Sequence, residues 1–146
     1  MLNSASEDFA PEATMGFFFE FDAVNHVARC RWEGLITDDI LLEGFSAADE
    51  FLASLIPCRG LVDFSDVTRF DVSNDTVRRM VDMPGVLGPE SLHVIVAPKD
   101  LLYGLARMFE ILSEKSHPNI HVVRTVKEAY ALLGVISPQF SRVNVA

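Results

Sequence analysis

The stretch Gly60–Met80, GLVDFSDVTRFDVSNDTVRRM, decides the fold that we expect for this chain of 146 residues. It begins with a short apolar run, Leu61 to Phe64, which has the length and composition of a buried strand. Residues Ser65 to Asp75 are rich in Asp, Ser and Asn, whose short side chains favour turns and helix caps. The stretch therefore predicts a strand, a polar turn and then a helix from about Ser73 to Met83.

Upstream of this stretch, the pattern predicts a hairpin followed by a long helix. The runs Phe17–Asp22 and Val27–Glu33 are rich in β-forming residues, and a short polar turn separates them. Gly34 is expected to end the second strand, and Thr37 to cap a helix that stops before Pro57. Gly44 lies in the middle of that helix, where close packing or chance would explain it.

Downstream, strands and helices continue to alternate. Leu92–Ala97 is a mostly apolar run typical of a strand covered on both faces, and Ile120–Arg124 is a second strand. A capping-box pattern beginning at Thr125 opens a helix that Gly134 is expected to end. The helix between these two strands has an apolar arc of about 120°, formed by Leu101, Leu102, Leu105, Met108, Phe109 and Leu112.

The resulting order, β-β-α-β-α-β-α-β-α, predicts the α/β class with a mixed, mostly parallel sheet of about five strands and four helices. We expect a single domain over residues 16–134, between a mobile tail at 1–15 and a C-terminal tail at 135–146. The opening hairpin carries three consecutive aromatic residues, Phe17–Phe19. These offer an apolar sheet edge through which a homodimer would form.

Composition limits the classes of partner. A formal net charge of −9 disfavours nucleic acid and anionic lipid surfaces, which attract basic proteins. We expect no membrane span, because no apolar run approaches the ~20 residues that a spanning helix needs. The two cysteines, Cys30 and Cys58, have no metal-binding spacing, and no signal peptide is visible. These features favour a reduced, cytoplasmic compartment and predict neither a metal nor a cofactor.

Catalysis is not expected from the sequence. Its cysteines and histidines lie on separate predicted elements, and no HExxH, Walker A, GxSxG or GxGxxG pattern occurs. His93 interrupts an apolar strand and would suit a ligand or a base. Because no second histidine or carboxylate flanks it in the sequence, we interpret it as a core or sheet-edge histidine.

Two groups of residues carry a resemblance to known families. The segments Leu61–Thr68 and Asp71–Asn74, together with the order of elements, resemble the STAS superfamily of anti-anti-sigma factors and transporter regulatory domains. The segments Val94–Pro98, Tyr103–Phe109 and His121–Arg124, with Glu128-Ala129, look more narrowly like the SpoIIAA-like family, which is described as STAS-like or CRAL-TRIO-like. The likeness covers roughly residues 16 to 134.

The resemblance implies a regulatory site at the start of one helix. In signalling STAS proteins this turn reads Asp-Ser-Ser-Gly, and a partner kinase phosphorylates its second serine. Ser73 matches that serine, whereas Val72 and Asn74 stand where the family has serine and glycine. From its position alone, Ser73 is also a good helix cap. Asp71 and Asn74 would belong to the same partner surface.

The expected function is therefore binding without chemistry. One hypothesis is a protein partner, engaged through a surface that includes Tyr103, Gly104 and Arg107 and is switched at Ser73. The alternative is a small apolar ligand or lipid, held in a pocket beneath the helix that carries Leu102, Met108 and Phe109. The breadth of that helix's apolar arc and the CRAL-TRIO comparison motivate the second hypothesis.

Overall fold

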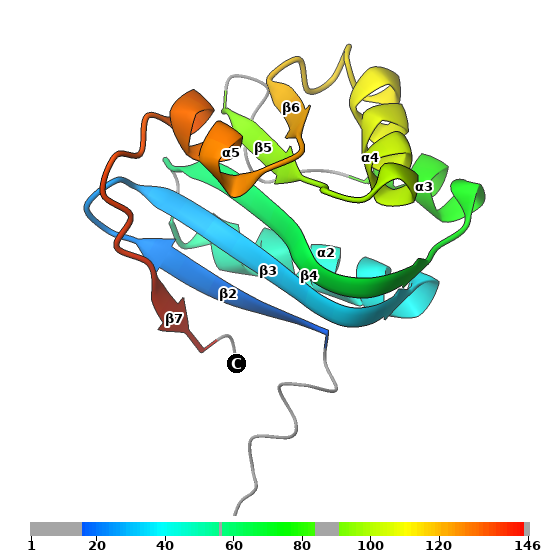
Figure 1. Cartoon of the computed structure of the whole chain (residues 1–146), viewed down its shortest axis with the longest axis horizontal. Helices are drawn as coiled ribbons and strands as arrows, with labels where there is room; N and C mark the ends of the chain where they lie inside the picture. The colour runs from blue at the N-terminus through cyan, green and yellow to red at the C-terminus, as the bar shows by residue number, and fades with distance from the viewer. Residues whose placement is uncertain (1–15, 56, 84–90, 145–146) are drawn as a thin grey trace, which may run out of the picture.

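The computed structural model describes residues 16–55, 57–83 and 91–144 of the chain. These residues form an α/β protein with a mixed six-stranded sheet and four helices (Figure 1), so the predicted fold class is confirmed. Along the chain, the elements are β2 (Phe17–Asp22), β3 (Val27–Thr37), α2 (Asp38–Ala53), β4 (Arg59–Asp71), α3 (Asn74–Val81), β5 (His93–Val96), α4 (Asp100–Leu112), β6 (Ile120–Val123), α5 (Val126–Leu133) and β7 (Ser141–Val143).

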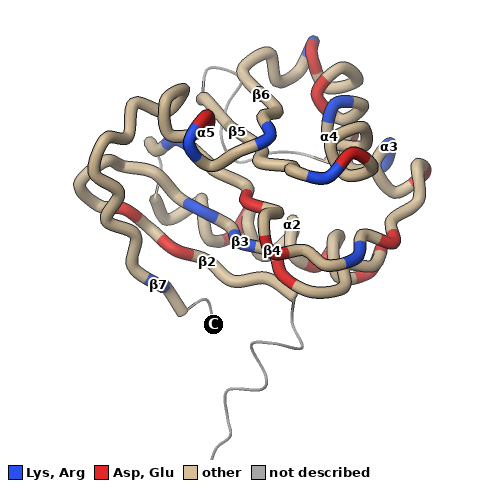
Figure 2. The backbone as a smooth tube through the Cα atoms, in the orientation of Figure 1, with Lys and Arg blue, Asp and Glu red and all other residues tan. Residues whose placement is uncertain are grey.

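The strands follow the order β6-β5-β4-β3-β2-β7 across the sheet. Strands β3, β4, β5 and β6 are parallel neighbours, whereas β2 runs antiparallel to both β3 and β7. Acidic residues of β2 and β4 lie beside the arginines of β3 (Figure 2). Arg29 of β3 pairs with Glu20 of β2, and Arg31 pairs with Asp66 of β4.

Helices cover the two faces of the sheet unequally (Figure 1). Helices α2, α3 and α4 pack over one face, where the buried side chains include Phe19, Trp32 and Phe51. Helix α5 covers part of the other face, over a smaller cluster that includes Leu61 and Val94. Each face therefore has its own hydrophobic core, and the first one is rich in aromatic residues.

Within the stretch Gly60–Met80, which decides the fold, one prediction is wrong. Ser65–Asp71, expected as a polar turn, continues β4 and pairs with β3 as far as Thr37. Gly34 does not end β3, because its positive φ of 72° accommodates a register shift and the strand continues. Because of these register shifts, the residues of β4 that face the core recur at every third position instead of every second. The alternation that identifies a strand in a sequence is therefore missing. The predicted Ser73 cap is confirmed, and α3 ends at Val81.

Close packing explains the glycine in the middle of α2. The indole of Trp32 lies against Gly44, and a Cβ atom at that position would come within 2.1 Å of the ring. Trp32 is 2% exposed and contacts the rings of Phe17, Phe45 and Phe64. Gly44 therefore brings α2 close enough to the sheet for the indole to be enclosed.

Residues 135–144 do not form the expected C-terminal tail, because they include a strand of the sheet. Strand β7 pairs with β2 over Phe19–Phe21, so the sheet edge expected to form a homodimer is occupied by the chain itself. The buried carboxylate of Asp22 also accepts hydrogen bonds from the backbone N–H groups of Asn25 and Gln139. Burial opposes ionisation of Asp22, but these hydrogen bonds outweigh it and lower the pKa of the carboxyl.

Several expectations concern residues outside the described ranges. The predicted mobile tail at 1–15 lies there, and so does the end of the expected C-terminal tail, residues 145 and 146. Within the ranges that are described, none of the helices has both the length and the apolar character needed to cross a membrane. The capping box at Thr125 and Glu128 is present, and Gly134 ends α5 in the left-handed conformation, as predicted.

Candidate functional site

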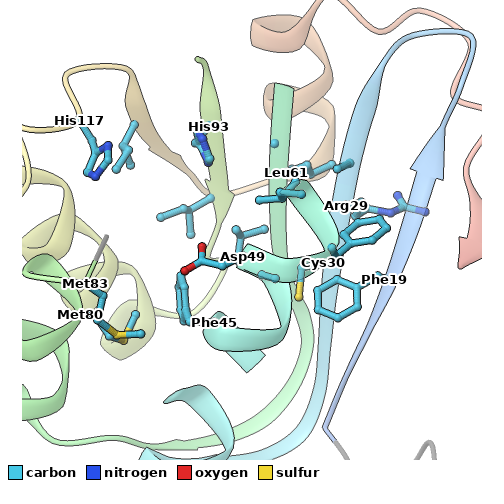
Figure 3. A pocket seen from close by; sticks show the side chains of 18 of the residues that line it. Phe19, Arg29, Cys30, Phe45, Asp49, Leu61, Met80, Met83, His93 and His117 are labelled. Carbon is cyan, nitrogen blue, oxygen red and sulfur yellow. The ribbon is translucent and has the colours of Figure 1, made fainter. Parts of the chain in front are cut away.

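A hollow of about 130 Å³ lies between the sheet and helices α2, α3 and α4. We call it the central pocket, and its wall is mostly apolar. It is defined by Cys30, Val62 and Ile95 of the sheet and by Phe45, Met80 and Phe109 of the helices. Figure 3 shows these elements around the hollow.

Strand register builds the floor of the central pocket. Cys30 of β3 lies beside Val62 of β4, which in turn lies beside Ile95 of β5. Register partners on adjacent strands point to the same face of a sheet, so all three side chains face the helices. The three helices contribute longer aromatic and methionine side chains, which leave space above this floor.

One end of the central pocket is polar. His93, the first residue of β5, extends its imidazole over Gly60 of β4, where a Cβ atom would come within 3.0 Å of Nδ1. The absence of a side chain at Gly60 gives the ring this position. Burial, together with nearby His117, lowers the pKa of His93 to about 4. His93 is therefore neutral at physiological pH.

His117 and Asp49 complete the polar end. His117 lies in the turn after α4, where its backbone N–H donates to the carbonyl of Ser113 over 2.7 Å. Asp49 comes from α2 and also lines the hollow (Figure 3). Two imidazoles and one carboxylate from three separate elements thus line the same pocket.

The guanidinium of Arg29 lies on the other face of the sheet, although Arg29 also borders the central pocket. Its Nε donates to Glu20 over 2.7 Å, and its Nη1 donates to the hydroxyl of Tyr130 on α5 over 2.9 Å. The same group lies over the ring of Phe140, with 3.9 Å between Cζ and the ring centroid. These three contacts hold its positive charge away from the pocket.

The cysteines of the chain are protonated thiols. Burial raises the pKa of Cys30 well above its ordinary value, and it also raises the pKa of Cys58. Cys30 lines the same pocket as His93, but two strand spacings and two residues separate their Cα atoms by about 12 Å. In the described ranges, no three or more His, Cys, Asp or Glu side chains are grouped so as to hold a metal ion.

The structure separates the three residues that we predicted for a ligand pocket beneath α4. Phe109 lines the central pocket. Leu102 lines, again with Phe109, a second hollow of about 30 Å³, whereas Met108 borders neither of these two hollows. The predicted apolar arc of α4 is also too wide, because Leu101 and Leu112 are 66% and 47% exposed.

Ser73, at the start of α3, does not line the central pocket. Its hydroxyl accepts from the N–H of Thr76 over 3.2 Å, as expected of a helix cap. Asp38 of α2 accepts from the backbone N–H of Ser73 over 2.9 Å, and this hydrogen bond lowers the pKa of Asp38. Asp71 and Asn74 are exposed beside it. A phosphate on Ser73 would therefore meet the charges of Asp38 and Asp71.

The predicted partner surface on α4 is a third location. Tyr103 is partly buried, and the guanidinium of Arg124 lies 3.9 Å from its ring centroid. Arg124 also pairs with Asp100 at the start of α4 over 2.7 Å. Arg107 is paired with Glu110 over 2.6 Å, and Gly104 is exposed. These residues do not line the central pocket.

Sequence reasoning missed the polar end of the central pocket. We interpreted His93 as isolated because no histidine or carboxylate flanks it, but the fold brings His117 and Asp49 to the same hollow. These three residues span positions 49 to 117, and no local pattern connects them. The packing of α2, β5 and the turn after α4 brings them to the same hollow.

Comparisons with models of protein families, with curated proteins and with solved structures each gave no match. The resemblance to the STAS superfamily and to the SpoIIAA-like family thus stays a prediction that rests on the segments quoted above.

Proposed function

We propose that this domain binds a small apolar molecule in the central pocket and performs no chemistry on it. The observation that carries the proposal is the hollow of about 130 Å³ with its mostly apolar wall. Ligand sites in proteins are typically concave and apolar, with a few polar groups that orient the ligand. The polar end formed by Asp49, His93 and His117 fits that description.

Leaving such a space empty is energetically unfavourable. Protein interiors are close-packed, and they contain few voids larger than a water molecule. At about 24 cal/mol per Å³, an unfilled apolar space of this size would cost up to about 3 kcal/mol of stability. A bound apolar molecule would recover part of this free energy by restoring contacts with Phe45, Phe109 and Ile95.

The size of the hollow limits the ligand. An apolar cavity of about 150 Å³ in another protein accommodates benzene. A molecule with a single ring, or a short branched chain, is therefore the largest apolar group that the central pocket holds without rearrangement.

Filling the pocket with a side chain tests the proposal. Ala48 of α2 lines the hollow, so Ala48→Leu should occupy it and abolish binding of toluene, measured by NMR titration of the full chain. Ala53→Leu, at an exposed position of the same helix, is the matched control and should bind toluene like the wild type. Absence of toluene binding to the wild type, or equal binding to all three proteins, would reject the proposal.

A second candidate function, binding of a protein partner, is favoured by the outward face of α4. Leu101 and Ile111 are 66% and 56% exposed on this helix, and Ile111 lies one turn after Arg107. Replacing both apolar residues with serine should change the free energy of unfolding by less than about 0.5 kcal/mol, as is usual for surface positions. The same change should remove any partner that co-purifies with the chain from its native cells, and an unaffected partner would contradict this candidate.

Regulation at Ser73 would require phosphate on that residue, which mass spectrometry of the native protein detects.

A further inference from the structure

We infer that the central pocket prefers a ligand with a single aromatic ring to a ligand with a saturated ring of the same size. This preference rests on the proposed function and adds the chemical class of the ligand. It arises from the aromatic rings and sulfur atoms of the wall, so it is independent of the polar end of the pocket.

Four phenylalanine rings of the wall form two pairs. The ring centroids of Phe19 and Phe51 are 4.8 Å apart, and those of Phe45 and Phe109 are 6.4 Å apart. Both separations lie within the range of about 4.5–7 Å over which aromatic side chains attract each other. Because these rings come from β2, α2 and α4, they border the hollow from three different elements.

The second pair keeps more of its surface available than the first. Phe19 and Phe51 are 3% and 6% exposed, whereas Phe45 and Phe109 are only partly buried. Phe45 also contacts the ring of Trp32, which is buried beneath α2. A ligand ring in the central pocket would thus extend an aromatic cluster that already exists in the core.

Sulfur atoms provide a second kind of contact for a ligand ring. Cys30, Met80 and Met83 line the same hollow (Figure 3). The thioether of methionine is polarisable and makes favourable contacts with aromatic rings, often at the ring edge. A saturated ring has no π-system, so it gains only dispersion from the same sulfur atoms.

The charge distribution of an aromatic ring explains why the two ligand classes differ. Its face is negative and its edge positive, so tilted and edge-to-face contacts with Phe45 and Phe109 are favourable beyond the burial of area. One such contact changes an affinity by a factor of roughly two to ten. Burial of apolar area alone gives no such preference, because rings of the same size bury similar areas.

Three alcohols that differ only in their ring test the inference: benzyl alcohol, cyclopentylmethanol and cyclohexylmethanol. They share a hydroxymethyl group, so the polar end contributes equally to the binding of each. Cyclopentylmethanol is similar in size to benzyl alcohol, and cyclohexylmethanol is larger. Each is titrated into the full chain, and its dissociation constant is determined from NMR chemical shifts. We expect benzyl alcohol to bind at least about threefold more tightly than either saturated alcohol.

Toluene, the probe of the proposed function, distinguishes the two ways in which the experiment can fail. If toluene binds, but cyclopentylmethanol binds as tightly as benzyl alcohol, the aromatic preference is overturned while the apolar site stands. If neither toluene nor any of the three alcohols binds, the proposed function is rejected and this inference falls with it.

A pair of variants assigns the preference to the rings of the wall. Phe109→Leu removes one ring but keeps an apolar side chain, and it should reduce the ratio of benzyl alcohol to cyclopentylmethanol affinity by about twofold or more. Phe21→Leu is the matched control and should leave the ratio unchanged, because Phe21 packs against the same core but lines neither hollow. An equal reduction in both variants, or none in Phe109→Leu, would overturn the role of Phe109. The wild-type ratios decide the aromatic preference even where Phe109→Leu fails to fold.

Discussion

The two faces of the sheet are packed in different ways. Under α5, small and branched side chains such as Val27, Val94 and Leu133 are at most 1% exposed. Under α2, α3 and α4, large aromatic side chains surround the central pocket. A single helix can lie flat on parallel strands, whereas three helices that carry long side chains meet above the sheet and leave a space. The difference teaches that one sheet can support a closely packed core on one face and a hollow on the other.

Replacing one leucine on each face of the sheet with alanine tests this difference in packing most directly. Leu133→Ala, in the core under α5, should lower the free energy of unfolding by about 2–5 kcal/mol because it leaves a void in a closely packed region. Leu52→Ala removes the same atoms from a half-buried side chain that borders the central pocket, and it should cost only about 1–2 kcal/mol. Urea unfolding measures both values. Equal losses would contradict the difference in packing between the two faces.

Gly44→Ala tests how closely α2 is packed on the aromatic face. Alanine favours helices over glycine by about 1 kcal/mol, but its methyl group would overlap the indole of Trp32. We expect a net loss of about 1–3 kcal/mol, typical of an overpacked core. Because Trp32 is the only tryptophan, its fluorescence reports the displacement during thermal unfolding. Ser46→Ala, exposed on the same helix, is the control, and a stabilising effect of Gly44→Ala would contradict the packing described here.

The smallest effect is expected at the end of β2, outside both cores. Asp22→Asn weakens the hydrogen bonds to Asn25 and Gln139 and should cost about 1 kcal/mol near neutral pH. The folded state lowers the pKa of Asp22, so its carboxylate contributes stability above the unfolded pKa of ~3.9 and loses that contribution as the pH falls through the lower folded value. Urea unfolding at several pH values should show the two proteins converging below about pH 4. A difference that stays constant over this range would contradict the assignment.

The sequence predicted the fold wherever the signal is local. Thr37, Ser73 and Thr125 cap their helices through their own side chains, and each was identified from neighbouring residues alone. The prediction failed where two distant segments decide the structure. The second half of β4 is a strand because β3 continues past Gly34 beside it, and neither segment shows this by itself.

The candidate site was predicted only in part, for the same reason. Phe109 was identified because its helix has a regular apolar periodicity. The space that it faces arises from the register of β3, β4 and β5, which brings together residues more than 60 positions apart. Asp49, His93 and His117 have no common pattern in the sequence, so their proximity follows from the packing of α2, β5 and the turn after α4.

Strand β7 has a consequence for the behaviour of the molecule in solution. Its three residues pair with Phe19–Phe21 and so cover outward backbone groups of β2 that would otherwise be an open template for another chain. A protein truncated after Gly134 would expose this aromatic edge of β2 to other molecules. Intermolecular β-pairing through the exposed edge would then form polymers. A short segment, held in place by a hydrogen bond to one buried carboxylate, thus protects the sheet from aggregation.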